Sequence, residues 1–129
     1  MANGSNDAWE KSSKELATFF ADLMPDASGL IHKQMFGWPC FFVNGNLFAG
    51  LHKQSMIFRL SDDDRAAFLR LEDAADFEPM PGRKMKGYVA LGNPMRLETR
   101  QLQEWVNRAL KHTRSLPAKT KGKSKTLRK

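Results

Sequence analysis

The first candidates in this chain for binding a metal or for acting as catalytic acids, bases or nucleophiles are three histidines, one cysteine and a run of three aspartates. His32, His52 and His112 do not follow metal-ligand spacing, since neither H-x-x-x-H nor C-x-x-C occurs. Asp62–Asp64 follows Ser61, a preferred helix N-cap residue, and adjacent carboxylates on a helix point about 100° apart. We therefore interpret the aspartates as first-turn charges that the helix dipole favours, and we predict no metal site.

Cys40 is the only cysteine in the sequence. A thiol becomes a good nucleophile where its pKa is lowered, for example at a helix N-terminus. Cys40 instead lies in the middle of the apolar stretch WPCFF, which favours an inert core thiol. No GxxxxGK[ST] phosphate-binding loop occurs either. The sequence thus predicts no cofactor and no catalytic residue, and we do not expect an enzyme.

The positive charge is concentrated at the C-terminus. Residues 117–129 hold six of the 21 Lys and Arg residues and no acidic residue, which leaves residues 1–116 with 15 basic and 14 acidic side chains. Lysines that alternate with small polar residues cannot bury an apolar face, so we predict a folded domain over 1–116 and a disordered tail over 117–129. The tail either attracts nucleic acid non-specifically or only adds solubility. Its candidate nucleic-acid contacts are Lys119, Lys121, Lys123, Lys125, Arg128 and Lys129.

A second group of candidate nucleic-acid contacts lies within the predicted domain. Arg83, Lys84 and Lys86 form a basic loop close to Tyr88, and such a loop can hold phosphates or a stacked base. A solvated loop without a ligand is the alternative interpretation.

Length and composition place the chain in a broad class. A chain of 129 residues is long enough for one domain, and a single cysteine excludes an internal disulfide framework. The N-terminus lacks the apolar segment of a secretory signal, and no apolar run approaches the roughly 20 residues that span a bilayer. We therefore predict a cytoplasmic protein that does not contact a membrane.

The elements that position these residues follow from hydrophobic periodicity. The pattern predicts a helix over 7–24, one long strand over 33–43 with a bend at 37–39, a strand over 46–52, a third strand at 55–60, a helix over 61–71, two strands within 76–80 and 86–92, and a final helix that ends near 114. We expect Asp7 and Glu10 to form a capping box for the first helix. The order α-β-β-β-α-β-β-α predicts an α+β domain in which helices pack on a five-stranded antiparallel sheet.

The best-defined local feature is a β-hairpin around Asn44-Gly45, a pair of residues suited to a two-residue turn. Simple pairing from this turn places Phe42 opposite Leu47 and Phe41 opposite Phe48. The side chains of Trp38, Cys40, Phe42, Leu47, Ala49 and Leu51 then form the more apolar face, which we expect beneath the terminal helices. Phe41 and Phe48 are left on the other face as a candidate protein interface, covered by a loop, a helix or a second copy of the chain.

Several short motifs in fixed order resemble the N-terminal domain of the TfoX/Sxy family, the regulators of natural competence. The motifs are Met35-Phe36-Gly37, Phe42 leading into Asn44-Gly45, Leu47-Phe48-Ala49, Phe77-Glu78-Pro79-Met80, Met85-Lys86-Gly87-Tyr88, Pro94 and the helix Leu102…Trp105…Ala109-Leu110. The similarity spans about residues 10–115. The resemblance implies a two-layer fold related to secretion-chaperone-like domains. It also implies a function in regulation or in binding other molecules, more than a catalytic function. The family's competence regulators carry a second, helical C-terminal domain, where this sequence has its lysine-rich tail.

Two hypotheses for function follow. The first is a non-enzymatic regulatory or adaptor domain that contacts another protein or a second copy of itself, linked to transcription or to the regulation of DNA uptake. The alternative is a nucleic-acid-binding protein that uses the basic tail and the Arg83–Lys86 loop.

Overall fold

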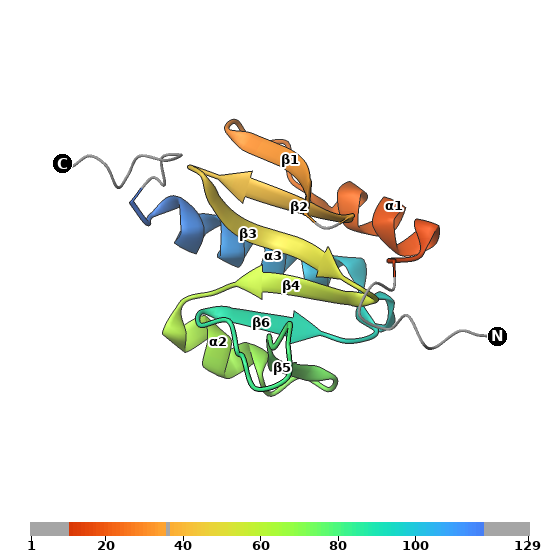
Figure 1. Ribbon diagram of the computed structural model, residues 1–129. Helices are drawn as coiled ribbons and strands as arrows, with labels where there is room; N and C mark the ends of the chain where they lie inside the picture. The colour runs from red at the N-terminus through yellow and green to blue at the C-terminus, as the bar shows by residue number, and fades with distance from the viewer. Residues whose placement is uncertain (1–10, 36, 118–129) are drawn as a thin grey trace.

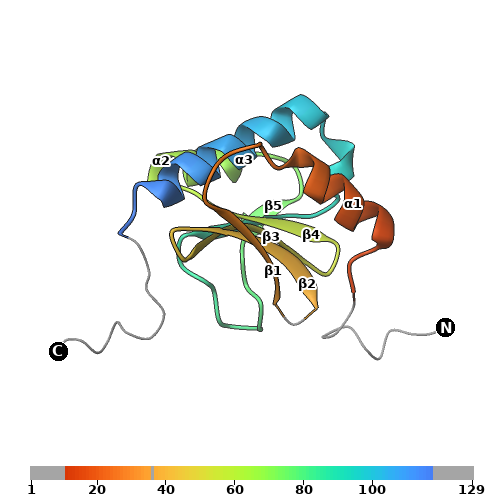
Figure 2. The same ribbon diagram turned by 90° about the horizontal axis from the view of Figure 1, so that it is seen from above.

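Three helices cover one face of a six-stranded antiparallel sheet, and no helix covers the other face within the described residues (Figures 1 and 2). The computed structural model describes residues 11–35 and 37–117. The sheet contains β1 (Leu30–Met35), β2 (Trp38–Val43), β3 (Asn46–His52), β4 (Ser55–Arg59), β5 (Ala74–Asp76) and β6 (Tyr88–Leu91), in the spatial order β1-β2-β3-β4-β6-β5. The helices are α1 (Lys14–Leu23), α2 (Asp62–Phe68) and α3 (Thr99–Arg114), with a 3-10 turn, η2 (Pro94–Arg96), before α3. The α+β, two-layer prediction is confirmed.

The helices begin where side chains satisfy their free backbone N–H groups. The Ser61 hydroxyl accepts a hydrogen bond from the Asp64 N–H at 3.2 Å, as the sequence predicts for α2. The Ser13 hydroxyl does the same for α1, accepting from the Leu16 N–H at 3.0 Å. The predicted start at Asp7 is therefore wrong, because residues 11–13 are not helical. The proposed capping box of Asp7 and Glu10 lies outside the described residues.

The predicted long bent strand is in fact two strands. β1 and β2 pair along their whole lengths, with Met35 opposite Trp38 and Leu30 opposite Val43. Gly37 has φ +88°, a left-handed backbone conformation that glycine adopts without strain, and it lies in the turn between the two strands. This extra strand makes the sheet six-stranded instead of five-stranded. The predicted strand at 76–80 is also displaced, since β5 spans Ala74–Asp76.

The Asn44-Gly45 turn is confirmed, with φ values of +54° and +78°. Phe42 lies opposite Leu47 as predicted, but the register shifts between Phe41 and Phe42, so that Phe41 lies opposite Ala49. This β-bulge gives β3 one extra residue and changes the face on which the residues after it lie.

The bulge decides which face forms the main core. Ala49 and Leu51 join Phe48 on the side of the helices, and all three are fully buried in one cluster with side chains of α1, α2 and α3. Phe41 packs against the same cluster and meets Phe20 of α1 edge-on at 5.5 Å. The expectation that the helices cover the face of Trp38 and Phe42 is therefore wrong. Phe48 is a core residue that no partner reaches in this fold.

The last helix matches its predicted stripe. Its buried residues are Leu102, Val106, Ala109, Leu110 and Thr113. The half-buried ring of Trp105 packs edge-on against Phe68 of α2 at 5.1 Å, which joins α2 and α3 above the sheet. No helix of the described part of the chain is both long and apolar enough to cross a bilayer.

Candidate protein interface

The face of the sheet opposite the helices, called here the helix-free face, carries a mixture of buried aromatic and exposed apolar side chains. Strand alternation and pairing place on it the side chains of Ile31, Lys33, Met35, Trp38, Cys40, Phe42, Leu47, His52, Ile57, Arg59, Tyr88 and Ala90. Phe77 follows β5, donates its N–H to the Tyr88 carbonyl at 3.1 Å and packs on the same face.

The floor of this face is a small second core. Ile57, Phe77 and Tyr88 are buried together, and Leu47 packs against them. The Tyr88 hydroxyl donates to the Leu47 carbonyl at 2.9 Å and accepts from Arg59 at 3.3 Å. Burial raises the pKa of Tyr88 despite the neighbouring guanidinium, so the phenol stays neutral and holds β6 to β3.

A row of rings crosses the helix-free face from β2 to the end of β5. The His52 ring lies 4.7 Å from the Trp38 ring and 5.2 Å from the Phe77 ring, measured between centroids. Burial between these rings, together with the nearby Lys53 charge, lowers the pKa of His52. His52 is therefore neutral at physiological pH and serves as part of an aromatic row.

Cys40 follows Trp38 by two residues on β2, on the same face, and is buried. Burial raises the pKa of its thiol to about 11, although hydrogen bonds with the backbone of Leu51 and Met35 oppose the rise. Gly50 lies directly opposite Cys40, and a Cβ at position 50 would be only 2.8 Å from the Cys40 sulfur. The thiol is thus protonated at neutral pH and tightly packed, as the interpretation of Cys40 as a core residue requires.

The rim of the helix-free face is apolar and exposed. Figure 2 shows that the segment between β5 and β6 extends beyond the sheet on the side away from the helices. Met80 and Met85 lie in this segment and are 60% and 37% exposed, whereas Met35 is the last residue of β1 and is 37% exposed. Ile31 of β1 is 50% exposed. Four large apolar side chains therefore flank a floor of buried rings.

The predicted basic loop borders the same face. Arg83, Lys84 and Lys86 are all exposed, and they lie in the segment between β5 and β6. The Lys84 ammonium lies 3.4 Å from the Asp76 carboxylate, and the Arg83 N–H donates to the Met80 carbonyl to close a turn at Pro81-Gly82. The structure thus brings these cations close to the exposed methionines.

The histidines and aspartates do not converge. His32 stacks on Phe41 at 4.6 Å on the side of the helices, so it is separated by the sheet from His52. Asp62 pairs with Arg65 at 3.1 Å, and Asp64 pairs with Arg108 of α3 at 2.7 Å. Within residues 11–35 and 37–117, no three His, Cys, Asp or Glu side chains are placed to hold a metal ion together.

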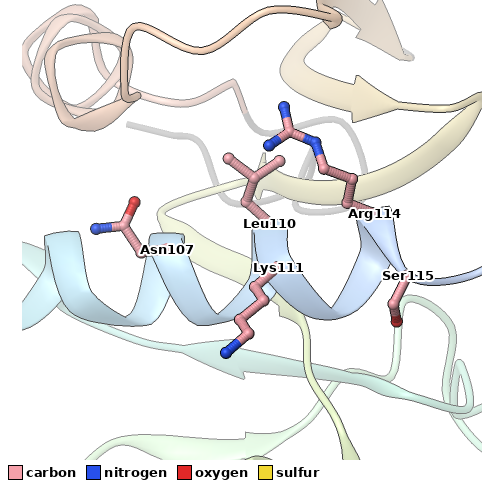
Figure 3. Close-up of a pocket in the computed structure, with 5 residues that line it drawn as sticks. All are labelled: Asn107, Leu110, Lys111, Arg114 and Ser115. Atoms are coloured by element: carbon pink, nitrogen blue, oxygen red, sulfur yellow. The ribbon is translucent and has the colours of Figure 1, made fainter.

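A surface hollow at the C-terminal end of α3 has no convergent polar groups. It is lined by Asn107, Leu110, Lys111, Arg114 and Ser115 (Figure 3). Lys111 and Arg114 point in different directions from the helix in this view. The Arg114 guanidinium is already bonded to the Ser28 carbonyl at 2.7 Å. The hollow therefore lacks the cluster of free cations that a phosphate group would need.

The C-terminal end of α3 is held against the turn between β2 and β3. The Asn44 side chain donates to the Arg114 carbonyl at 3.2 Å, and the Asn46 side chain donates to the Pro117 carbonyl at 3.1 Å. The remaining candidate contacts, Lys119, Lys121, Lys123, Lys125, Arg128 and Lys129, lie outside the described residues.

Sequence reasoning missed the exposed part of this surface. Ile31 lies before the strand predicted over 33–43 and Met35 lies within it, so neither was expected on an edge strand, whereas β1 spans Leu30–Met35. Gly37 was the available signal, since a glycine between two apolar strand segments also fits a tight turn. Met80 and Met85 were named only as parts of the family motifs, which do not indicate exposure.

The comparisons with known proteins agree with the resemblance drawn from the motifs. The model of the family described as TfoX N-terminal domain matches residues 22–113, which covers most of the chain and nearly all of the folded part described above. No curated protein and no solved structure matches the sequence significantly. The matched region includes all six strands, α2 and α3 up to residue 113, and it therefore contains the whole helix-free face. The chain belongs to the TfoX N-terminal domain family, a family of regulatory domains.

Proposed function

We propose that this protein is a regulatory adaptor that acts by binding another protein on its helix-free face. The observation that carries the proposal is the exposed apolar rim formed by Ile31, Met35, Met80 and Met85 around a rigid aromatic floor. Membership of a regulatory family supports the same conclusion.

The composition of the rim suits a protein contact. Ile31 and Met35 lie at the β1 edge of the sheet, whereas Met80 and Met85 lie near its β5 edge. Together with the floor between them they make one face of the domain apolar, a feature that commonly marks interaction sites, and fully burying one large apolar side chain is worth about 1.5–3 kcal/mol. Methionine side chains are flexible and polarizable, so they adapt to the shape of a partner. The floor needs no rearrangement, because Tyr88 is already fixed by hydrogen bonds to Leu47 and Arg59. A rigid floor with an adaptable rim lowers the entropic cost of binding.

The polar groups of the helix-free face favour a protein-binding function over a catalytic one. The Tyr88 hydroxyl is occupied by two partners, the Cys40 thiol is buried, and His52 lies between two rings. None of these groups is presented to a substrate. The cations of the loop between β5 and β6 add a positive border, which favours a partner with acidic residues.

Site-specific photo-crosslinking in the native host tests this proposal. A photoreactive amino acid is placed at position 35 or 85 on the helix-free face, and at position 69 or 95 as controls. Leu69 and Met95 are 38% and 42% exposed apolar residues outside that face, so they match Met35 and Met85 in exposure. We expect positions 35 and 85 to capture one and the same protein, identified by mass spectrometry, and the controls not to. Capture only from positions 69 and 95, or no capture at all, would show the proposal to be wrong.

A further inference from the structure

β1 is an edge strand with an open outer side. It is first in the spatial order, β2 is the only strand of residues 11–35 and 37–117 that pairs with it, and five of its six residues are exposed. The opposite edge strand, β5, has only three residues. A long exposed edge presents unpaired N–H and C=O groups that another extended segment can pair with.

We propose that β1 accepts an extended, acidic segment of the partner as an additional strand of the sheet. This inference deepens the proposed function and rests on it. The added strand pairs its backbone with the outer edge of β1 and places a carboxylate beside Lys33, with apolar side chains on either side of the carboxylate that contact Ile31 and Met35.

The charge of Lys33 sets the chemistry of the partner. The Lys33 ammonium lies over the Phe42 ring, 5.6 Å from its centroid, and no carboxylate of the described residues pairs with it. Lys33 therefore presents a positive charge in the middle of the edge, on the helix-free face, with no carboxylate of the described residues to compensate it. Opposite charges on neighbouring strands stabilise the pair, whereas like charges destabilise it.

The same charge argues against a second copy of this chain as the occupant. Two β1 strands that pair antiparallel about a two-fold axis at or beside Lys33 bring the two copies of Lys33 opposite each other or onto the neighbouring diagonal, on the same face of the sheet. Lysine at an exposed edge is a common device against such self-pairing. A heterologous acidic strand relieves the repulsion, and a second copy does not.

The alternation of β1 gives the expected pattern of the added strand. Ile31, Lys33 and Met35 point to the helix-free face, whereas His32 and Gln34 point to the other side. A matching segment therefore has the form apolar, polar, acidic, polar, apolar. Its two apolar side chains extend the apolar rim, since Ile31 and Met35 are 50% and 37% exposed when β1 is unpaired.

Titration of the isotope-labelled full chain with short peptides tests the inference by NMR. The probe is the peptide TVTETVT; the controls are TVTKTVT and a backbone N-methylated TVTETVT, which cannot form the strand ladder. We expect TVTETVT to shift the amide signals of Leu30–Met35 saturably. We expect at least fivefold weaker binding of both controls, and the Lys33→Glu variant to prefer TVTKTVT by a similar factor. Thermal unfolding checks that the exposed substitution leaves the domain folded.

The results separate this inference from the proposed function. Unchanged β1 amides at millimolar TVTETVT, equal binding of the three peptides, shifts confined to the helices, or dimerisation through β1 would each overturn strand addition. If crosslinking at positions 35 and 85 still captures one protein, the proposed function stands without strand addition. If the peptides bind β1 as described and no protein is captured, β1 accepts acidic strands and the proposed function fails.

Discussion

The ring of Phe41 meets the ring of Phe20 edge-on, with centroids 5.5 Å apart and planes inclined by 68°. This contact fixes Phe41 on the side of the sheet that α1 covers. The next residue, Phe42, consequently points to the helix-free face, where it is only partly buried. The two neighbouring phenylalanines thus belong to opposite sides of the domain, one to the core and one to the candidate interface.

Truncation of Phe48 is expected to destabilise the fold strongly. Phe48 is fully buried in the main core, so Phe48→Ala should lower the free energy of unfolding by about 3–5 kcal/mol. Met85→Ala, at a 37% exposed position, is the control and should cost less than about 1 kcal/mol. Urea unfolding followed by circular dichroism measures both. A folded, stable Phe48→Ala variant with a changed oligomeric state would instead restore Phe48 as an interface residue.

Glycine should be required at position 50 for full stability, because a larger residue there would clash with the sulfur atom of Cys40. A Cβ at position 50 would lie 2.8 Å from that sulfur, so Gly50→Ala should cost about 1–3 kcal/mol of stability. In a Cys40→Ala background the nearest remaining atom, the Cβ of residue 40, lies 3.5 Å away, and Gly50→Ala should then cost little. A double-mutant cycle measures this coupling. Equal costs in the two backgrounds would disprove the close contact.

His52 should make the domain less stable at acidic pH. Burial lowers its pKa in the folded state below the ordinary value of 6.5, so its contribution to stability is present above pH 6.5 and is lost as the pH falls. The His52→Gln variant should therefore lose part of the decline in unfolding free energy between pH 7 and pH 5. His112→Gln is the matched control and should keep the decline. Identical pH profiles for His52→Gln and the parent protein would contradict the buried environment of the ring.

The basic tail should carry any general affinity for nucleic acid. Truncation after Pro117 keeps the contact of Asn46 with the Pro117 carbonyl and removes six cationic side chains. If all six engage phosphates, the log–log salt slope of binding to duplex DNA approaches about −5 in the full chain. The truncated chain should lose most of this binding and keep its melting temperature. Tight or sequence-selective binding by the truncated chain would instead place the contacts on the folded surface, with Arg83, Lys84 and Lys86 the first residues to substitute.

Local sequence patterns predicted the helices, strands and turns better than they predicted which face of the sheet the helices cover. The Asn44-Gly45 turn, the Ser61 cap and the apolar stripe of α3 depend on neighbouring residues in the sequence, and all three are confirmed. The turn at Gly37 was mistaken for a bend, because glycine fits both a bulge and a turn.

The candidate interface was misplaced for a longer-range reason. Beyond the Asn44-Gly45 turn, the register depends on a bulge between Phe41 and Phe42, and the bulge is stabilised by the packing of Phe48 beneath the helices. A single inserted residue exchanges the faces of all residues after it, so the more apolar face was assigned to the wrong side of the sheet. The packing of the sheet against α1 and α3 decides which face is buried, and the sequence near the turn does not contain this long-range information.

The most direct test of the central claim is co-purification from the native host with charges placed on matched apolar residues. Met35→Asp and Met85→Asp change the helix-free face, and Leu69→Asp makes the same change at equal exposure outside it. All three variants should remain folded in circular dichroism. The partner identified by crosslinking should be lost from Met35→Asp and Met85→Asp and retained by Leu69→Asp. Retention of the partner by both methionine variants, or its loss from Leu69→Asp alone, would contradict the assignment of partner binding to the helix-free face.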